Sequence, residues 1–172
     1  EINGFDFSIK SKKDLGKFGE IYYSIDTSIL KNFLTPSSDK TKLINRVGKF
    51  NHDNHTFSLP EKKINTFLSW KFSEMSFNVN TRYIDGYINE REIKPVAVNL
   101  GYTNKIKSSF MVDISATRNI NLKTGKLNIK LSVINLFDKS APRLYDAPDF
   151  SFDTRVHDPR GRIFGVGVEY NH

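Results

Sequence analysis

The residue types best suited to bind a metal ion or to move protons fall in two stretches of the chain. The first is His-Asp-Asn-His at residues 52–55, which places two imidazoles and one carboxylate within four positions. A structural zinc site needs about four ligands, and two histidines in a polar stretch without further fixed ligands are more commonly solvated. We therefore expect no metal ion and no cofactor at His52, Asp53 and His55.

The second stretch, residues 148–160, reads Pro-Asp-Phe-Ser-Phe-Asp-Thr-Arg-Val-His-Asp-Pro-Arg. The carboxylates of Asp149, Asp153 and Asp158 and the imidazole of His157 do not follow the spacing of a calcium-binding loop. The chain has no Gly-x-Ser-x-Gly, phosphate-loop or His-Glu-x-x-His motif, and its spacing singles out no carboxylate pair. We therefore predict no enzyme activity and no catalytic residue. The candidates for ligand contacts are loop residues, namely Arg143, Asp153, Arg155, His157 and Arg160.

Strands are the elements that must position these loops, because apolar and polar residues alternate along much of the chain. In residues 4–10, for example, Phe5, Phe7 and Ile9 share one face and polar residues share the other. Segments with this period of two are typical of half-buried strands. They are residues 4–10, 20–29, 64–72, 76–83, 110–117, 127–133 and 163–170. The sequence thus predicts an all-β fold, an antiparallel up-and-down sheet of about seven strands.

Two architectures use strands with one apolar and one polar face. In a soluble β-sandwich the apolar faces form the core, whereas in an outer-membrane barrel they contact lipid and the polar faces line the lumen. The connections alternate in length, with short ones at 10–17, 73–74 and 118–126 and long ones at 30–63, 86–107 and 138–162. This alternation favours the barrel, which has short turns at one end and long loops at the other.

The barrel interpretation assigns a neighbour to each face of the sheet. The residues expected to face lipid are Phe7, Ile25, Leu68, Val79, Val112, Ile129 and Val166. The residues expected to face the lumen are Asp26, Asn80, Asp113, Asn128 and Lys130. Aromatic residues also lie near predicted strand ends, where the interfacial girdles of membrane barrels form. They are Phe18, Trp70, Phe72, Phe77, Phe110, Phe137, Phe164 and Tyr170.

The composition narrows the range of partners. The net charge is +7, but the basic residues are spread along the chain and form no helical stripe, so no nucleic acid is expected. Cysteine is absent, which excludes disulfides and thiolate metal sites. The chain begins on Glu1 already in strand register, and a bacterial single-chain barrel has an even count of at least ~8 strands. We therefore expect that further strands precede this segment.

Two motifs flank the last long connection. The first is Asn135, Leu136, Phe137, Asp138 and Lys139, and the second is Pro159, Arg160, Gly161 and Arg162. They resemble the end of the penultimate strand and the opening of the last strand in TonB-dependent outer-membrane receptors. Residues 1–8 also resemble a recurrent strand start of that family. The chain differs at its end, where His172 replaces the usual aromatic residue; an altered assembly signal, trimming or a tag would each explain this.

The resemblance implies that residues 1–172 are the C-terminal segment of a 22-stranded transmembrane β-barrel, without its plug domain and earlier strands. Such a receptor lies in the bacterial outer membrane and takes up a bulky nutrient such as a ferric siderophore, cobalamin or a glycan. Its implied partners are outer-membrane lipid, its own plug domain and TonB, and the sequence does not name the transported ligand. Two alternatives stay open: a soluble β-sandwich that binds a ligand such as carbohydrate, and a barrel with protease or lipase activity.

Overall fold

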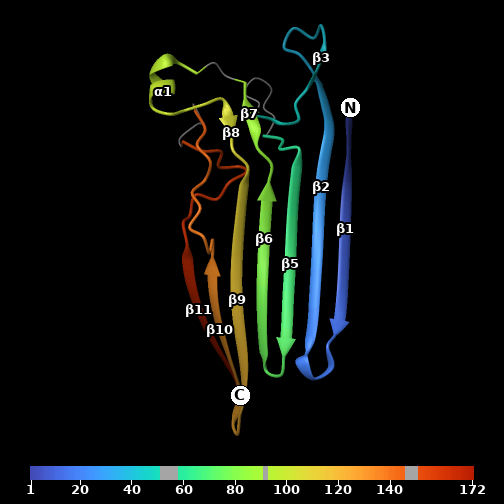
Figure 1. Cartoon of the computed structure of the whole chain (residues 1–172), viewed down its shortest axis with the longest axis vertical. Coiled ribbons are helices and arrows are strands. Elements are labelled where there is room, and N and C mark those ends of the chain that lie inside the picture. Colours follow the sequence, from blue (N-terminus) through green and yellow to red (C-terminus); the bar gives the residue numbers. More distant parts are fainter. Residues whose placement is uncertain (51–57, 91–92, 146–150) are drawn as a thin grey trace.

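One antiparallel sheet makes up most of the computed structural model, which describes residues 1–50, 58–90, 93–145 and 151–172 (Figure 1). Seven strands follow one another across it in the order β1-β2-β5-β6-β9-β10-β11, and β3 pairs with the end of β2. Their bounds are β1 Ile2–Asp14, β2 Glu20–Pro36, β3 Leu43–Asn45, β5 Lys62–Phe72, β6 Met75–Ile84, β9 Ser109–Leu122, β10 Gly125–Ile134 and β11 Ile163–Asn171. The fold is all-β, as predicted, and the sheet is open, with β1 and β11 at its edges.

Cross-strand pairing joins the apolar positions of neighbouring strands into one face. Leu68 of β5 lies opposite Tyr23 of β2 on one side and opposite Val79 of β6 on the other. Val79 in turn lies opposite Ile114 of β9. A shift of one residue in any pair would turn an apolar set to the polar face, and the observed register keeps the two sets apart. The residues predicted for lipid and those predicted for the lumen therefore lie on opposite faces.

The apolar face is open to solvent along the sheet. Large apolar side chains with more than a third of their surface exposed come from all seven strands of the main path. They include Phe7, Tyr23, Leu68, Phe77, Phe110, Leu131 and Val166. Val112 is an exception, because it lies on this face but is only 8% exposed. The few residues of the hydrophobic core cluster lie elsewhere, in the long connections beyond the ends of the main sheet's strands.

The other face carries polar side chains that bond to one another across strands. Ser8 donates a hydrogen bond to the Asp26 carboxylate at 2.7 Å, and Asn78 donates one to the Ser115 hydroxyl at 3.2 Å. An ionic contact of 3.6 Å joins Arg82 to Asp113. These contacts satisfy polar groups that an apolar neighbour would leave unpaired.

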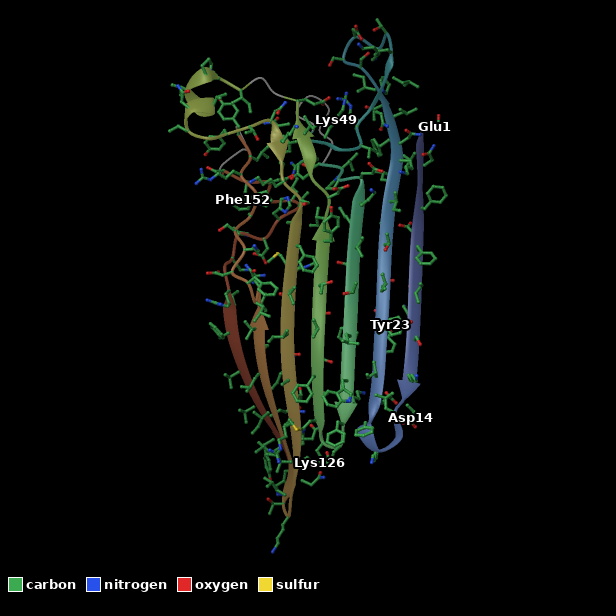
Figure 2. All side chains as sticks on the ribbon, viewed as in Figure 1. Glu1, Asp14, Tyr23, Lys49, Lys126 and Phe152 are labelled. Atoms are coloured by element: carbon green, nitrogen blue, oxygen red, sulfur yellow. The ribbon has the colours of Figure 1, made fainter. Side chains whose placement is uncertain are left out.

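The connections sort by length to the two ends of the sheet, as predicted. The short turns β1–β2, β5–β6 and β9–β10 lie at one end, and the three long connections lie at the other (Figure 1). Figure 2 shows Lys49 and Phe152, from two different connections, at the same end as Glu1, with Asp14 and Lys126 at the opposite end. The β5–β6 turn has two residues, and Ser73 takes a positive φ of 52°, as tight hairpin turns require.

Several predicted boundaries are wrong, and pairing explains the differences. The first strand runs to Asp14 and the second to Pro36, because β1 pairs along the length of β2 and β3 pairs with its end. The β9–β10 turn shrinks to two residues for the same reason. Gly125 begins β10 with a positive φ of 159°. A side chain there would collide with the Asn171 carbonyl oxygen of β11.

The long connections are not simple loops, because they contain short elements of their own. A second sheet is formed by β4 Lys49–Phe50, β7 Tyr87–Asn89 and β8 Lys105–Ile106, and α1 spans Pro95–Asn99. We call these four elements, together with residues 58–60 and the described part of 138–162, the loop cap. Its core consists of Tyr87, Ile106 and Leu144, packed against Phe50 and Val156. Among the described residues, no helix is long and apolar enough to cross a membrane.

Candidate functional site

The first candidate site is the turn that follows β10, where the two motifs noticed in the sequence meet. Asn135 is fully buried and takes a positive φ of 53°. Its Oδ1 accepts a hydrogen bond from the Lys139 backbone N–H at 2.9 Å, and its Nδ2 donates one to the Lys139 carbonyl at 2.9 Å. Its own backbone N–H donates to the Asp113 carboxylate of β9 at 2.8 Å. One side chain thus closes the turn and fixes it to the neighbouring strand.

Asp138 connects this turn to the start of β11. Its carboxylate accepts a hydrogen bond from the Arg162 backbone N–H at 2.8 Å. A side chain at Gly161 would place its Cβ 2.9 Å from the same carboxylate oxygen, which explains why glycine suits this position. The Asn135–Lys139 and Pro159–Arg162 motifs are therefore in direct contact, and they act as a structural clamp between β10 and β11.

The second candidate site is a buried polar cluster in the loop cap. The Asp153 carboxylate accepts hydrogen bonds from the Ser58 hydroxyl and from the Tyr87 hydroxyl, the latter at 2.9 Å. The Arg155 backbone N–H also donates to this carboxylate, at 3.1 Å. The ring of His157 stacks on Tyr87 with a centroid distance of 6.1 Å and an angle of 4° between planes. Three connections that are distant in the sequence thus converge on one carboxylate.

Burial sets the ionisation of this cluster. It raises the pKa of Tyr87, and the neighbouring Asp153 carboxylate adds to the shift, so the phenol stays protonated and remains a donor. Burial lowers the pKa of His157, and the opposing attraction of Asp153 is the smaller effect. The imidazole is therefore neutral at pH 7, with one N–H donor and one acceptor nitrogen.

The five predicted ligand candidates divide into two groups. Asp153 and His157 lie together in the buried cluster. The arginine side chains are exposed. The backbone of Arg143 forms an isolated antiparallel β-bridge with that of Phe152, and the Arg160 side chain pairs with Asp158 through hydrogen bonds of 2.7–3.1 Å. Arg155 is exposed next to Asp153. Four of the candidate metal-binding residues weighed in the sequence lie outside the described part of the chain: His52, Asp53, His55 and Asp149.

Among the described residues, the cluster contains no hydrogen bond between a hydroxyl group and an imidazole. The Ser58 hydroxyl donates its hydrogen bond to the Asp153 carboxylate, and no hydrogen bond joins it to an imidazole within the described residues. Among the described residues, no group of three His, Asp or Glu side chains could hold a metal ion. The arrangement fits a role in fixing the loop cap and in holding the buried His157 ring against Tyr87.

Sequence reasoning missed Tyr87 and Ser58, which hold the cluster together, and Asn89, which lies in the same strand as Tyr87. Asn89 is buried and donates a hydrogen bond to the Tyr145 carbonyl at 3.0 Å. None of the three belongs to a motif, and Ser58 meets Asp153 across 95 positions of sequence. Strand β7 could not be predicted from the alternation of apolar and polar residues, because its three residues are too few to show such a pattern.

Acid is expected to break the Asp158–Arg160 pair at an unusually low pH. The hydrogen bonds from Arg160 lower the pKa of Asp158 from 3.8 to about 2. A depressed pKa means that the pair stabilises the fold above pH 3.8, and that this contribution is lost as the pH falls through about 2. A carboxyl ¹³C titration of the chain should show two aspartates with midpoints near 2, Asp39 and Asp158, and Asp158→Asn should remove one of these two signals. A midpoint near 3.8 would contradict the pairing.

The clamp and the buried cluster each have a defined geometry, but no matching protein indicates a function for either of them. Comparison of the chain with protein-family models, with curated proteins and with solved structures gives no match.

Proposed function

We propose that the chain forms part of the wall of a TonB-dependent receptor barrel in the bacterial outer membrane, with the loop cap outside the cell. The observation that carries the proposal is the apolar face, which seven consecutive strands expose without any covering layer among the described residues. Soluble monomers rarely expose contiguous apolar surface on this scale. A lipid bilayer satisfies such a face and leaves the polar face for the lumen.

The distribution of aromatic residues supports the same proposal. Trp70 stacks on Phe77 at 5.6 Å and lies 5.9 Å from Phe72, close to the β5–β6 turn. The indole N–H donates to the Phe18 carbonyl at 2.9 Å. Rings with one apolar side and one polar contact suit the boundary between lipid and water. At the other end, Phe110 and Phe164 are the second residues of β9 and β11.

The two sheet edges support a barrel that includes further strands. β1 and β11 each present one row of backbone groups to no other strand of the described chain. In a bilayer each unpaired group costs several kcal/mol, so both edges need partners there. The proposed receptor supplies them with its remaining strands, and its plug domain would pack against the polar face. Coupling to TonB and uptake of a ferric siderophore, cobalamin or a glycan belong to the same proposal.

The soluble sandwich has less support. A sandwich needs a second sheet about 10 Å away from the apolar face. The second sheet of this chain, β4-β7-β8, has only two or three residues in each strand and lies beyond the end of the main sheet (Figure 1). The barrel enzyme has no specific observation in its favour.

The purified chain is expected to require detergent for a defined size. In plain buffer the apolar face and the free edges of β1 and β11 should pair between molecules and give aggregates. In detergent micelles the same chain should elute as a narrow peak by size-exclusion chromatography. Circular dichroism should report strand structure in both conditions, which serves as the control for folding. A monomer in plain buffer with a cooperative thermal transition would contradict the proposal.

A further inference from the structure

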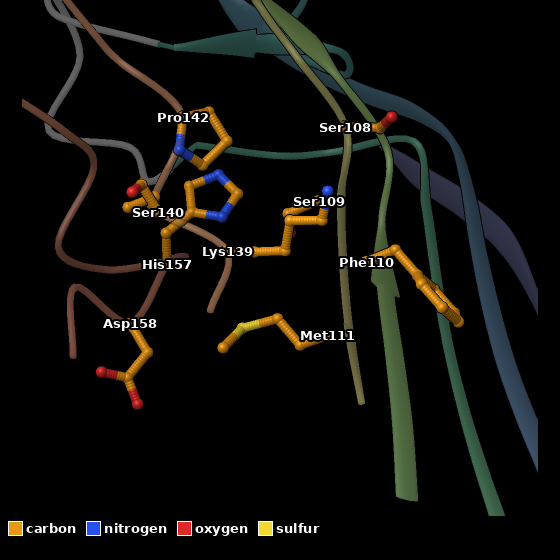
Figure 3. A pocket seen from close by; sticks show the side chains of 10 residues that line it. Ser108, Ser109, Phe110, Met111, Lys139, Ser140, Pro142, His157 and Asp158 are labelled. Carbon is orange, nitrogen blue, oxygen red and sulfur yellow. The ribbon is translucent and has the colours of Figure 1, made fainter. Parts of the chain in front are cut away.

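A cavity of about 330 Å³ lies between the start of β9 and the loop cap (Figure 3). Its volume is at the lower end of the range for small-molecule sites. Three segments line it: residues 108–111 at the start of β9, residues 139–142 after β10, and residues 157–158 before β11. Figure 3 shows His157, Lys139 and Met111 around a common space, with Phe110 pointing to the far side of β9.

His157 gives this cavity a polar group without a partner. The residue is 7% exposed, and its Nε2 is buried and makes no hydrogen bond within the part of the chain that the structure describes. Figure 3 shows the edge of the imidazole that carries the two nitrogens turned toward β9. Buried polar atoms are nearly always hydrogen-bonded, and one that is not indicates a place where a ligand, an ion or a water molecule binds. The neutral ring offers an N–H donor to whatever enters.

Lys139 supplies the charge. Its side chain crosses the cavity toward Ser109 (Figure 3), and within the described ranges it forms no ion pair with a carboxylate. Asp158, the acidic residue of the lining, is already neutralised by the two-pronged contact with Arg160. The hydroxyls of Ser109 and Ser140 add further donors to the wall. The cavity is therefore rich in donors and carries one uncompensated positive charge.

We propose that this cavity binds a small carboxylate, or the carboxylate end of a larger molecule, with Lys139 and His157 as its principal contacts. A carboxylate presents two acceptor oxygens, which match the ammonium group and the imidazole N–H. A monoanion matches a single cation, whereas a phosphate dianion would leave one charge without a partner in a half-enclosed site. A metal cation is disfavoured by the ammonium group of Lys139. The inference goes beyond the proposed transport function and does not depend on it.

The chain contains two methionines, which provide the measurement. Met111 lines the cavity, while Met75 begins β6 at the opposite end of the sheet. The chain is labelled with ¹³C-methyl methionine, purified in detergent micelles and titrated with sodium acetate at constant ionic strength. We expect the Met111 signal to shift and to saturate while the Met75 signal stays in place. Acetamide, which has the same shape without the charge, should bind at least about tenfold more weakly.

Two variants test the assigned contacts. Lys139→Met keeps the length of the side chain and removes the charge, and it should weaken acetate binding at least about tenfold. Lys123→Met, in the β9–β10 turn at the other end, should bind acetate as the natural chain does. His157→Gln should weaken binding too, and the Lys139 variant decides the matter if that protein does not fold.

Several results would overturn the inference. They are a Met111 signal that ignores acetate, equal binding of acetate and acetamide, and unchanged binding by Lys139→Met. Tighter binding of inorganic phosphate than of acetate would overturn the choice of a monoanion. A chain that needs detergent but shows no acetate response would refute this site and leave the receptor proposal standing. A chain that needs no detergent but binds acetate would refute the receptor proposal and leave this site standing.

Discussion

Replacing Asn135 by alanine is expected to lower the free energy of unfolding by about 2–4 kcal/mol. The side chain is fully buried and holds both backbone groups of Lys139 at 2.9 Å. Its removal breaks both of these part-buried hydrogen bonds, each of which contributes about 1 kcal/mol. Alanine must also adopt the positive φ of 53°, which costs about 1–2 kcal/mol. Denaturant titration in detergent, followed by tryptophan fluorescence, measures the change.

Two control variants separate the causes of this loss. Asn135→Gly tolerates the positive φ but lacks the hydrogen bonds, so it should recover about 1 kcal/mol relative to alanine. Asn121→Ala makes the same chemical change at an exposed position of β9 and should stay within about 0.5 kcal/mol of the natural chain. Equal stability of the Asn135 and Asn121 variants would show that the clamp contributes nothing.

The sequence predicts the main sheet well because each long strand repeats the same local rule. Leu127, Ile129 and Leu131 alternate with polar residues and pair in register with β9 and β11. Such an alternation can be recognised in the local sequence without any knowledge of distant contacts. The hairpin order also follows from local information, since short turns join neighbouring antiparallel strands.

The loop cap could not be predicted, because its structure depends on contacts between distant segments. Strands β4, β7 and β8 have two or three residues each, and β4 pairs with β7 in parallel. Asp153 and His157 were predicted as loop residues that contact a ligand, and the structure shows them buried. Ser58 and Tyr87 bury them, and nothing in the local sequence around residues 151–158 indicates those partners.

The clamp after β10 is an intermediate case. Its two motifs were noticed in the sequence for their resemblance to a receptor family, and the structure gives them a physical role. Asn135 tolerates positive φ better than most residues, and its amide matches both the donor and the acceptor of Lys139. Sequence alone did not indicate that Asp138 would reach the Arg162 N–H across the last long connection.

Replacing Leu131 by arginine is expected to distinguish a lipid-facing sheet from a soluble one. Leu131 lies in β10, opposite Ala116 and Val166, and is 54% exposed on the apolar face. In water, arginine at such a half-exposed position should change the free energy of unfolding by about 0.5 kcal/mol or less. In a bilayer, arginine on the lipid face costs about 2–4 kcal/mol at the midplane. The measurement is a urea titration of the chain folded into phosphatidylcholine vesicles.

A matched variant on the other face of the same strand provides the control. Asn128 points to the polar face, three residues before Leu131, where it donates a hydrogen bond to Asn119 at 2.6 Å. Asn128→Arg gives up one exposed hydrogen bond, so it should cost about 1 kcal/mol or less in the same vesicles. The receptor proposal requires that Leu131→Arg cost clearly more than Asn128→Arg. Equal costs for the two variants would mean that lipid does not contact the apolar face, and the outer-membrane placement would then have to be abandoned.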